Sequence, residues 1–358
     1  MPGLADFYLF VDVEWRRYVL FLFSGCVGAV LFEALNLGPL ERVSVEVARL
    51  TLFVGVNRAG KSIVARSLAA VTTALYRASV EYAKALAEKR RGRYVEVRPL
   101  SELFLEELED FALEIPVRAG AKSVKIKLYH GGRVLLVEKD VLGNFKVGGD
   151  LVETAAKQVE ASLRIGREEY FDFDPLFYPW STLEWCNRLY PAAARWLASA
   201  FDIVVSQEAV FEGGVEVRNP SSMVVSLADL ARRGGCRNLV LEEPEAHLHD
   251  DAVFELAKFL YAEASRGKGF LVATHSDLLT AWVVALAAHP NPGELGVEVG
   301  ERPSVKVYRF HLRRVGDAYA EELDLRGGEV DMDEAQLRVL ESLERALRAV
   351  KNALRAGR

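Results

Sequence analysis

The segment Gly55–Ser62 constrains the fold of this chain more than any other part of its sequence. It follows the apolar run Leu50–Val54 and precedes a stretch whose apolar residues recur at helical spacing. Glycines at its first and sixth positions allow a tight turn whose backbone N–H groups point inward, towards a phosphate chain. A helix that begins at this point adds the positive end of its dipole. The segment therefore predicts a phosphate-binding loop between a buried strand and a helix, and with it nucleotide binding.

Most residues of this loop have an expected contact with the nucleotide. Lys61 would carry a mobile positive charge to the β- and γ-phosphates, and the hydroxyl of Ser62 would bind Mg²⁺. The residues predicted to contact the phosphates are Gly55, Asn57, Arg58, Ala59, Gly60, Lys61 and Ser62.

The composition is that of a globular protein without a broad attraction to nucleic acid. The 358 residues, 27% of them charged and 51% apolar, suffice for one large domain or two modest ones. The net charge of −6 means that DNA binding would need a local basic patch, and the basic run Lys89–Arg93 is better explained as a helix C-terminus. The widely spaced Cys26, Cys186 and Cys236 predict reduced, buried thiols in a cytoplasmic protein.

An apolar run near the N-terminus, Val19–Phe32, has more than one interpretation. A membrane span wants ~20 apolar residues, and this run is shorter. A signal peptide begins with positive charge, whereas Asp6, Asp12 and Glu14 precede the run. We therefore predict two buried strands broken near Ser24-Gly25 and no membrane association, with an anchor, an export segment or a mis-assigned start as the alternatives.

The remaining elements follow from apolar spacing and turn residues. The helix after Ser62 is expected to run to Ala87, with Val64, Leu68, Val71 and Leu75 on its buried face. The expected strands are 31–35, 42–47, 94–97, 124–129, 133–138, 238–241, 269–273, 305–312 and 318–325; the expected helices are 101–113, 151–163, 182–200, 224–233, 251–265 and 336–358.

Two carboxylates end the apolar strand Asn238–Leu241. In a chain with a phosphate loop, Glu242 at the strand end would reach Mg²⁺ directly or through water. Glu243, the next residue, would hold and polarise an attacking water. An exposed acidic turn after a strand is the alternative. His247 and His249 lie close by in sequence, but two histidines without further ligands are more often structural than metal-binding.

A third motif follows the strand Gly269–Ala273. Ligands bind beyond the carboxyl ends of the strands in open α/β sheets, and Thr274 and His275 stand at such an end. His275 is therefore a candidate for contact with the γ-phosphate, and with Glu243 it forms the predicted catalytic pair.

Taken together, Gly55–Ser62, Leu239–His249 and Thr274–Ser276 resemble the ABC-type ATPase head of the RecF, SMC and overcoming-lysogenisation-defect group, and most of all its small prokaryotic AAA-domain ATPases. The resemblance covers roughly residues 30–320. It implies an α/β P-loop NTPase with an antiparallel β edge sheet, a mostly parallel αβ core and an inserted α+β lobe. It also implies two heads that close around two molecules of ATP.

Such closure needs a signature motif from the second chain. Ser221 and Ser222 lie where the family places it, before the predicted helix Val224–Arg233, and would contact the γ-phosphate in trans. Plain helix capping is the alternative. Met223 replaces the usual glycine, and the family's Q-loop glutamine is missing, since Gln158 is the first glutamine after the phosphate loop.

The resemblance also implies a division of the chain and an activity. Residues 1–99 and 219–325 would form the ATPase core, 100–218 the inserted lobe and 326–358 a C-terminal helix. The implied activity is hydrolysis of ATP to ADP and phosphate with Mg²⁺ by a homodimer. The alternative is a nucleotide-gated binding module with little turnover in DNA repair, phage defence or a toxin–antitoxin system, in which DNA or a protein would be the partner. Glu329, Asp331 and Asp333 are similar to a Toprim nuclease triad, but the tail is too short for that domain.

Overall fold

The computed structural model describes residues 30–164, 180–206, 209–218, 220–314, 316–323 and 325. The predictions for residues 19–29, for the C-terminal helix 336–358 and for Glu329, Asp331 and Asp333 fall outside these ranges. In the described part of the chain, no helix is both long enough and apolar enough to span a lipid bilayer.

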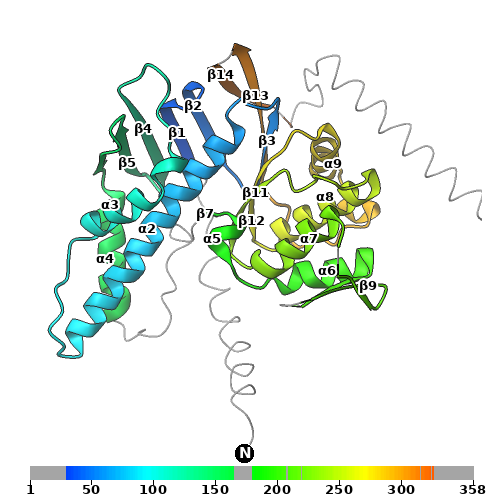
Figure 1. The fold of residues 1–358 in the computed structure, drawn as a ribbon, viewed down its shortest axis with the longest axis horizontal. Helices are drawn as coiled ribbons and strands as arrows, with labels where there is room; N and C mark the ends of the chain where they lie inside the picture. Colours follow the sequence, from blue (N-terminus) through cyan, green and yellow to red (C-terminus); the bar gives the residue numbers. More distant parts are fainter. Residues whose placement is uncertain are drawn as a thin grey trace, which may run out of the picture.

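The centre of the fold is an eleven-stranded mixed sheet with the strand order β6-β5-β4-β1-β2-β14-β13-β3-β12-β11-β7 (Figure 1). Its first five strands pair antiparallel, and β13, β3, β12, β11 and β7 run parallel to one another. The strands are β1 (Val30–Leu37), β2 (Leu40–Val47), β3 (Leu50–Gly55), β4 (Ser123–His130), β5 (Arg133–Asp140), β6 (Phe145–Gly148), β7 (Trp180–Ser181), β11 (Asn238–Glu242), β12 (Gly269–Ala273), β13 (Val305–Arg314) and β14 (Asp317–Glu322). The predicted α/β class, with an antiparallel edge and a parallel core, is confirmed.

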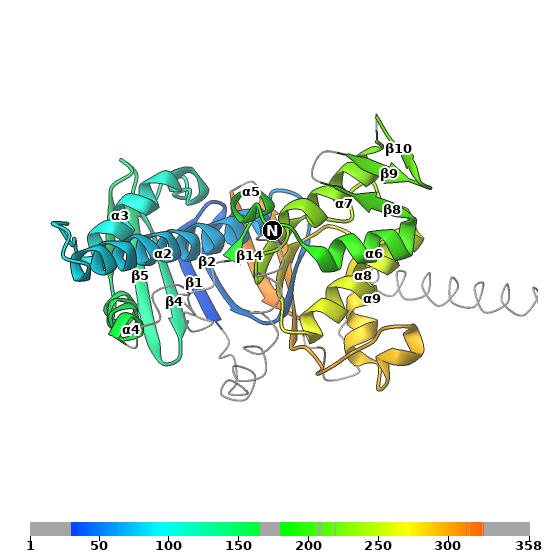
Figure 2. The same ribbon diagram turned by 90° about the horizontal axis from the view of Figure 1, so that it is seen from below.

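Two groups of helices cover the sheet, and the parallel strands lie between them (Figure 2). The first group is α2 (Lys61–Arg90), α3 (Leu100–Asp110), the short η1 (Ala112–Glu114) and α4 (Leu151–Arg164). The second group is α5 (Leu183–Cys186), α6 (Pro191–Phe201), α7 (Ser222–Arg233), α8 (Asp250–Ser265), α9 (Asp277–Ala288) and the short η3 (Pro292–Leu295). A small separate sheet of β8 (Ile203–Val205), β9 (Val210–Glu212) and β10 (Val215–Glu216) accompanies the second group.

The parallel strands are buried on both faces because their alternate residues enter different cores. On β3, Phe53 belongs to a core with α2, whereas Leu52 and Val54 belong to a core with α8 and α9. On β12, Leu271 faces the first core and Val272 the second. Side chains alternate with period two along a strand, so a continuous apolar run is what a strand between two helical layers requires.

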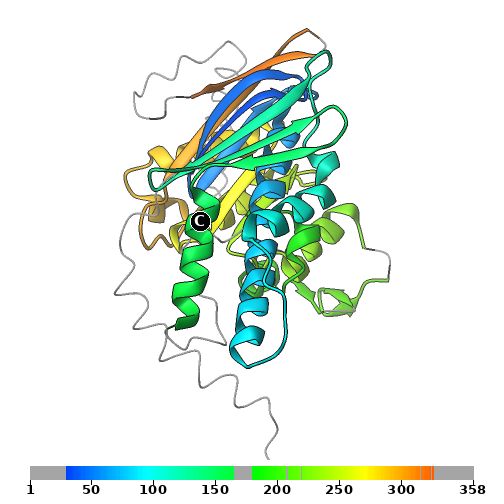
Figure 3. The same ribbon diagram turned by 90° about the vertical axis from the view of Figure 1, so that its left-hand side faces the viewer.

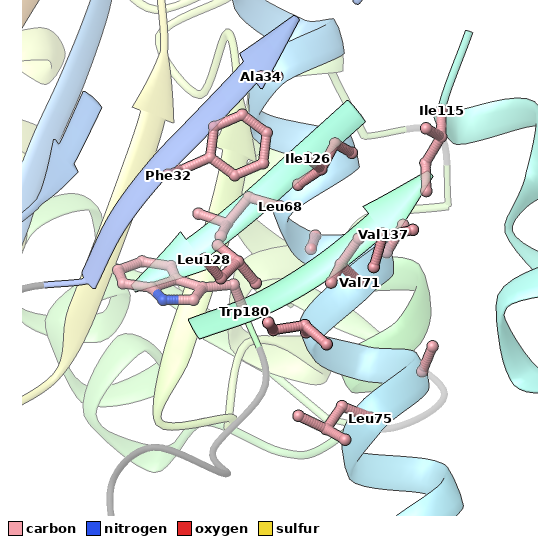
Figure 4. Packing of buried hydrophobic residues seen from close by; sticks show 14 of the residues in the cluster. Phe32, Ala34, Leu68, Val71, Leu75, Ile115, Ile126, Leu128, Val137 and Trp180 are labelled. Atoms are coloured by element: carbon pink, nitrogen blue, oxygen red, sulfur yellow. The ribbon is translucent and has the colours of Figure 1, made fainter. Parts of the chain in front are cut away.

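The long helix α2 packs one face against the antiparallel strands (Figures 3 and 4). Leu68, Val71 and Leu75 follow one another at intervals of three and four residues, and they join the same buried cluster as Phe32 of β1 and Leu128 of β4. Each such side chain stabilises the fold by about 1.5–3 kcal/mol through removal from water. The predicted buried face of this helix is confirmed, and the helix continues to Arg90.

Two of the predicted elements are wrong. Residues 94–97 form no strand and Tyr94 is fully exposed, so this segment does not gain the pairing and burial that stabilise a strand. The predicted helix 182–200 is broken into α5 and α6. Asn187 ends α5 in a left-handed conformation, with φ of 45°, and Pro191 begins α6.

The stretch expected to form an inserted lobe, residues 100–218, contributes to both ends of the sheet. Its strands β4, β5 and β6 extend the antiparallel end, while β7 is the last strand of the parallel end. The boundaries proposed for the four segments stay a prediction.

Cys186 and Cys236 form a disulfide with Cα atoms 5.7 Å apart, so the prediction of reduced thiols is wrong for this pair. Hydrogen bonds between the segments that contain the two cysteines hold them side by side. The amide of Gly235 donates to the carbonyl of Arg188 at 2.8 Å, and the amide of Cys236 lies 2.9 Å from Cys186 Sγ. Disulfides are typical of oxidising compartments and also of the intracellular proteins of hyperthermophiles.

Removing this disulfide is expected to lower the free energy of unfolding by about 2–4 kcal/mol, because the bond closes a long loop in the unfolded chain. The two cysteines are separated by 50 positions in sequence. Guanidinium denaturation of the C186S/C236S variant measures the effect, with C26S as the matched control that leaves the bond intact. An unchanged denaturation midpoint in the double variant would contradict the expectation.

Candidate functional site

The segment Gly55–Ser62 forms a loop between the end of β3 and the start of α2. Gly55 has φ of 128°, and a Cβ atom there would lie 2.2 Å from the carbonyl oxygen of Phe310. Gly60 is the N-cap of α2 with φ of 98°, and a Cβ atom there would lie 2.9 Å from a methyl group of Leu40. Both positions therefore require glycine, for conformation and for space. The loop has the strand–turn–helix setting predicted for it.

Lys61 crosses back over this loop. Its Nζ donates hydrogen bonds to the carbonyl oxygens of Gly55, at 2.6 Å, and Val56, at 3.0 Å. Burial lowers the pKa of the Lys61 amine, and the carboxylates of Glu243 and Glu245 oppose that shift. Among the described residues no carboxylate lies within ion-pairing distance of this amine. A cation held only by carbonyl dipoles at a helix N-terminus suits an anionic ligand.

The other residues of the loop differ in what they present. Asn57 and Arg58 are exposed, and Arg58 adopts a left-handed conformation with φ of 66°. Ala59 is fully buried, so only its backbone is available to a ligand. Ser62 follows Lys61 in the first turn of α2 and is partly exposed, which leaves its hydroxyl accessible.

The three motifs meet because β12 lies between β3 and β11 and all three strands run parallel. Backbone hydrogen bonds continue this pairing beyond the strand ends. The amide of Thr274 donates to Phe53 at 2.9 Å, and the amide of Glu243 donates to Ala273 at 2.8 Å. The phosphate loop, the Glu242-Glu243 pair and the Thr274-His275 pair therefore leave the same edge of the sheet, where open α/β sheets bind ligands.

Glu243 and His275 face each other across this edge. Glu243 Oε1 lies 3.2 Å from His275 Nδ1, and both side chains are about half exposed. Glu243 adopts a left-handed conformation with φ of 45°, which costs a residue with a Cβ atom about 1–3 kcal/mol. Such strain is often found at active sites, and here it turns the carboxylate towards His275. The pair can hold a water and accept its proton.

Glu242 is held by a residue that sequence analysis missed. Arg66 donates from Nε to Glu242 Oε1 at 2.5 Å and from Nη2 to Oε2 at 3.3 Å, which engages both oxygens of the carboxylate. Arg66 lies four residues after Ser62, one turn further along α2 and on the same face. That spacing is the signal that would have placed Arg66 at the site.

Glu245 is a second residue to which the sequence assigned no role. It is buried, with 8% of its surface exposed, and it accepts a hydrogen bond from the hydroxyl of Thr274. The amide of Ser276 in turn donates to the Thr274 hydroxyl at 2.9 Å. The other oxygen, Glu245 Oε2, is buried without a hydrogen-bond partner among the described residues. These contacts fix the turn that presents His275.

Ser221 and Ser222 begin α7, and Asn219 before them lies outside the described residues. Ser221 is the N-cap, and its Oγ accepts from the amide of Val224 at 3.4 Å. In the described part of the chain, no hydrogen bond joins either serine to the phosphate loop. Both serines are exposed, whereas Met223 is partly buried and packs against the core beneath α7. Its side chain therefore leaves the start of the helix accessible.

The donor set suits Mg²⁺ bound together with a nucleotide. Mg²⁺ at phosphate sites takes one or two protein oxygens and completes its shell with water and phosphate oxygens. The hydroxyl of Ser62 and the carboxylate of Glu242 are groups of this kind. Among the described residues, no three His, Cys, Asp or Glu side chains gather as a metal site of their own, which gives no support to a metal at His247 and His249.

The chain resembles solved structures at low sequence identity, while no family model matches it and a search of curated proteins finds no match. It is similar to the SMC head domain from Thermotoga maritima, with a TM-score of 0.46 and 13% identity over 83% of this chain and 99% of the other. The SMC head bound to the C-winged helix domain of ScpA has a TM-score of 0.47 and 13% identity, over 84% and 99% of the two chains. The Pyrococcus furiosus SMC head with an extended coiled coil, bound to the C-terminal domain of ScpA, has a TM-score of 0.47 and 12% identity over 88% and 99%.

Proposed function

We propose that this chain is an ABC-type ATPase, which binds ATP with Mg²⁺ at Gly55–Ser62 and hydrolyses it to ADP and phosphate. The observation that carries the proposal is that this loop and the Glu243–His275 pair lie at the same edge of the sheet. Glu243 Oε1 is 3.2 Å from His275 Nδ1. A phosphate-binding loop alone would fit many nucleotide-binding proteins. The carboxylate–imidazole pair beside it adds groups that can hold and deprotonate a water.

Each residue of the site has a defined task in this reaction. Lys61 leaves the loop carbonyls and places its charge on the β- and γ-phosphates of ATP. Ser62 and Glu242 hold the metal, which when bound neutralises charge on the phosphate oxygens. Glu243 accepts the proton of the water that attacks the γ-phosphorus, and His275 orients Glu243 and contacts the γ-phosphate.

The second half of the site is proposed to come from another copy of this chain. The N-terminus of α7 is exposed at Ser221 and Ser222 and makes no hydrogen bond to its own phosphate loop among the described residues. Two serine hydroxyls, backbone N–H groups and a helix dipole form a suitable contact for a γ-phosphate held by a partner chain. ATP would therefore lie between two chains.

This arrangement predicts that ATP hydrolysis depends on protein concentration. At protein concentrations below the dissociation constant of the dimer, phosphate release per chain is expected to rise in proportion to the concentration of the chain, because half of each site is missing in the monomer. The S221A/S222A variant is expected to lose this rise while it still binds ATP. The S226A variant, altered one turn further along the same helix, is the control. A constant rate per chain across a thousandfold dilution, in a range where light scattering shows that the chain has become monomeric, would exclude the trans site.

A binding module with little turnover is the second candidate, and the contact between Arg66 and Glu242 favours it. A carboxylate with both oxygens engaged by a guanidinium is a weaker ligand for a metal. Phosphate release measured with and without added DNA separates the two candidates. Slow release that DNA or a protein partner accelerates would support a gated module.

A further inference from the structure

Arg66 binds the carboxylate of Glu242, which is the proposed metal ligand. It therefore competes with a metal for that carboxylate. Its Nε and Nη2 engage the two oxygens of Glu242, at 2.5 and 3.3 Å. Ser62 and Arg66 share one face of α2, one turn apart. The hydroxyl that would bind the metal and the guanidinium that holds the carboxylate therefore project from the same side of the helix.

A second carboxylate lies within reach of the same guanidinium. Arg66 Nη1 is 3.6 Å from Glu114 Oε1, on η1 after α3. The hydrogen bond to Glu242 raises the pKa of Arg66 against the opposing effect of burial, and the charges of Glu242, Glu114 and Glu184 add to the increase. Arg66 therefore has another acceptor for its charge when it leaves Glu242.

The Arg66–Glu242 pair also lies beside open space. A pocket of about 240 Å³ adjoins the pair and is lined by Arg66, Glu184, Glu242 and Glu243 together with residues of α7. The Arg66 side chain keeps 39% of its surface exposed, and that of Glu242 keeps 28%. A change of rotamer at Arg66 does not require repacking of the core, because the side chain is not enclosed by it.

We propose that Arg66 is a positioning residue that gates metal binding. In the nucleotide-free chain it holds Glu242 by both oxygens. When metal and nucleotide arrive together, its guanidinium transfers to Glu114, and Glu242 becomes free to bind the metal. The gate rests on the proposed function, and it links the metal position to η1 and α3, which pack against α2.

The affinity of the protein–nucleotide complex for Mn²⁺, measured by electron paramagnetic resonance with a non-hydrolysable ATP analogue, tests the gate without reference to activity. In R66Q, Glu242 has lost its competitor, so Mn²⁺ is expected to bind about tenfold more tightly. In E114Q the second acceptor has lost its negative charge, so the guanidinium stays on Glu242 and Mn²⁺ is expected to bind about threefold more weakly. The R66Q/E114Q double variant is expected to behave as R66Q.

A purely structural role for the ion pairs would move both single variants in the same direction. Unchanged or weaker Mn²⁺ binding in R66Q would overturn the gate, and so would a double variant that differs from R66Q. R66K serves if R66Q does not fold: a lysine keeps the charge but cannot engage both oxygens, and an intermediate affinity is expected. Binding of the analogue to the wild-type chain in the presence of Mg²⁺ keeps the two proposals apart. A chain that binds no analogue contradicts the proposed function, whereas one that binds it with equal Mn²⁺ affinity in all variants contradicts only the gate.

Discussion

K61A is expected to raise the dissociation constant for ATP by about 100-fold or more. The amine makes no ion pair among the described residues, and its hydrogen bonds go to the carbonyls of Gly55 and Val56, so its charge is available to a phosphate. Hydrogen bonds to charged groups contribute about 1.5–3 kcal/mol each, and Lys61 would make two of them to ATP. Their loss corresponds to at least two orders of magnitude in affinity.

Isothermal titration of ATP with and without Mg²⁺ measures this loss. K84A, which removes an exposed lysine from the same helix, is the matched control and should bind ATP as the wild type does. Because Lys61 binds only loop carbonyls, K61A should unfold at a temperature close to that of the wild type. ATP binding that survives in folded K61A would contradict both the nucleotide site and the ATPase.

The parts of this site that sequence analysis found are those whose signal is local. The glycine-rich loop, the carboxylates after β11 and the histidine after β12 each follow a buried strand within a few residues. A parallel sheet then brings strand ends together wherever the strands fall in the sequence. The meeting of Glu243 with His275 follows from the position of β12 between β3 and β11.

The parts that sequence analysis missed depend on distant contacts. In the sequence nothing distinguishes Arg66 from other charged residues of α2. Its role depends on the contact with Glu242 at the end of β11. Cys186 and Cys236 carry no motif, and only the closure of the chain at Arg188 and Gly235 brings their sulfur atoms together. Each case needs the tertiary arrangement, which local spacing does not contain.

The effect of Met223 on the proposed dimer contact also depends on the tertiary arrangement. The sequence has a bulky residue where the related motif has glycine, and a side chain at that position could obstruct the close approach of a partner chain. In the structure this side chain packs against the core cluster under α7, while Ser221 and Ser222 are exposed. The direction of a side chain on the first turn of a helix depends on the cap, here Ser221. The objection to a closed dimer is thereby weakened, and the trans contact stays a proposal.

E243Q is expected to lower the rate of ATP hydrolysis by about 100-fold or more and to leave ATP binding intact. A positioned general base contributes about 10²–10⁴-fold to such a reaction, and an amide cannot accept the proton of the attacking water. Among the described residues no hydrogen bond or ion pair joins Glu243 to the loop, and its contact with His275 can be kept by the amide oxygen. Binding and hydrolysis should therefore separate in this variant.

The same substitution is expected to make a dimer visible. If ATP joins two chains and hydrolysis separates them, a chain that binds ATP without hydrolysing it should accumulate as the ATP-bound pair. Size-exclusion chromatography with light scattering measures this, with E153Q, an exposed glutamate on α4, as the control that should hydrolyse ATP normally. The dimer should disappear when K61A or S221A/S222A is combined with E243Q, since one removes the nucleotide and the other the trans contact. A monomer of E243Q in saturating Mg-ATP would refute the dimeric mechanism, while slow hydrolysis in that monomer would still leave Glu243 as the base.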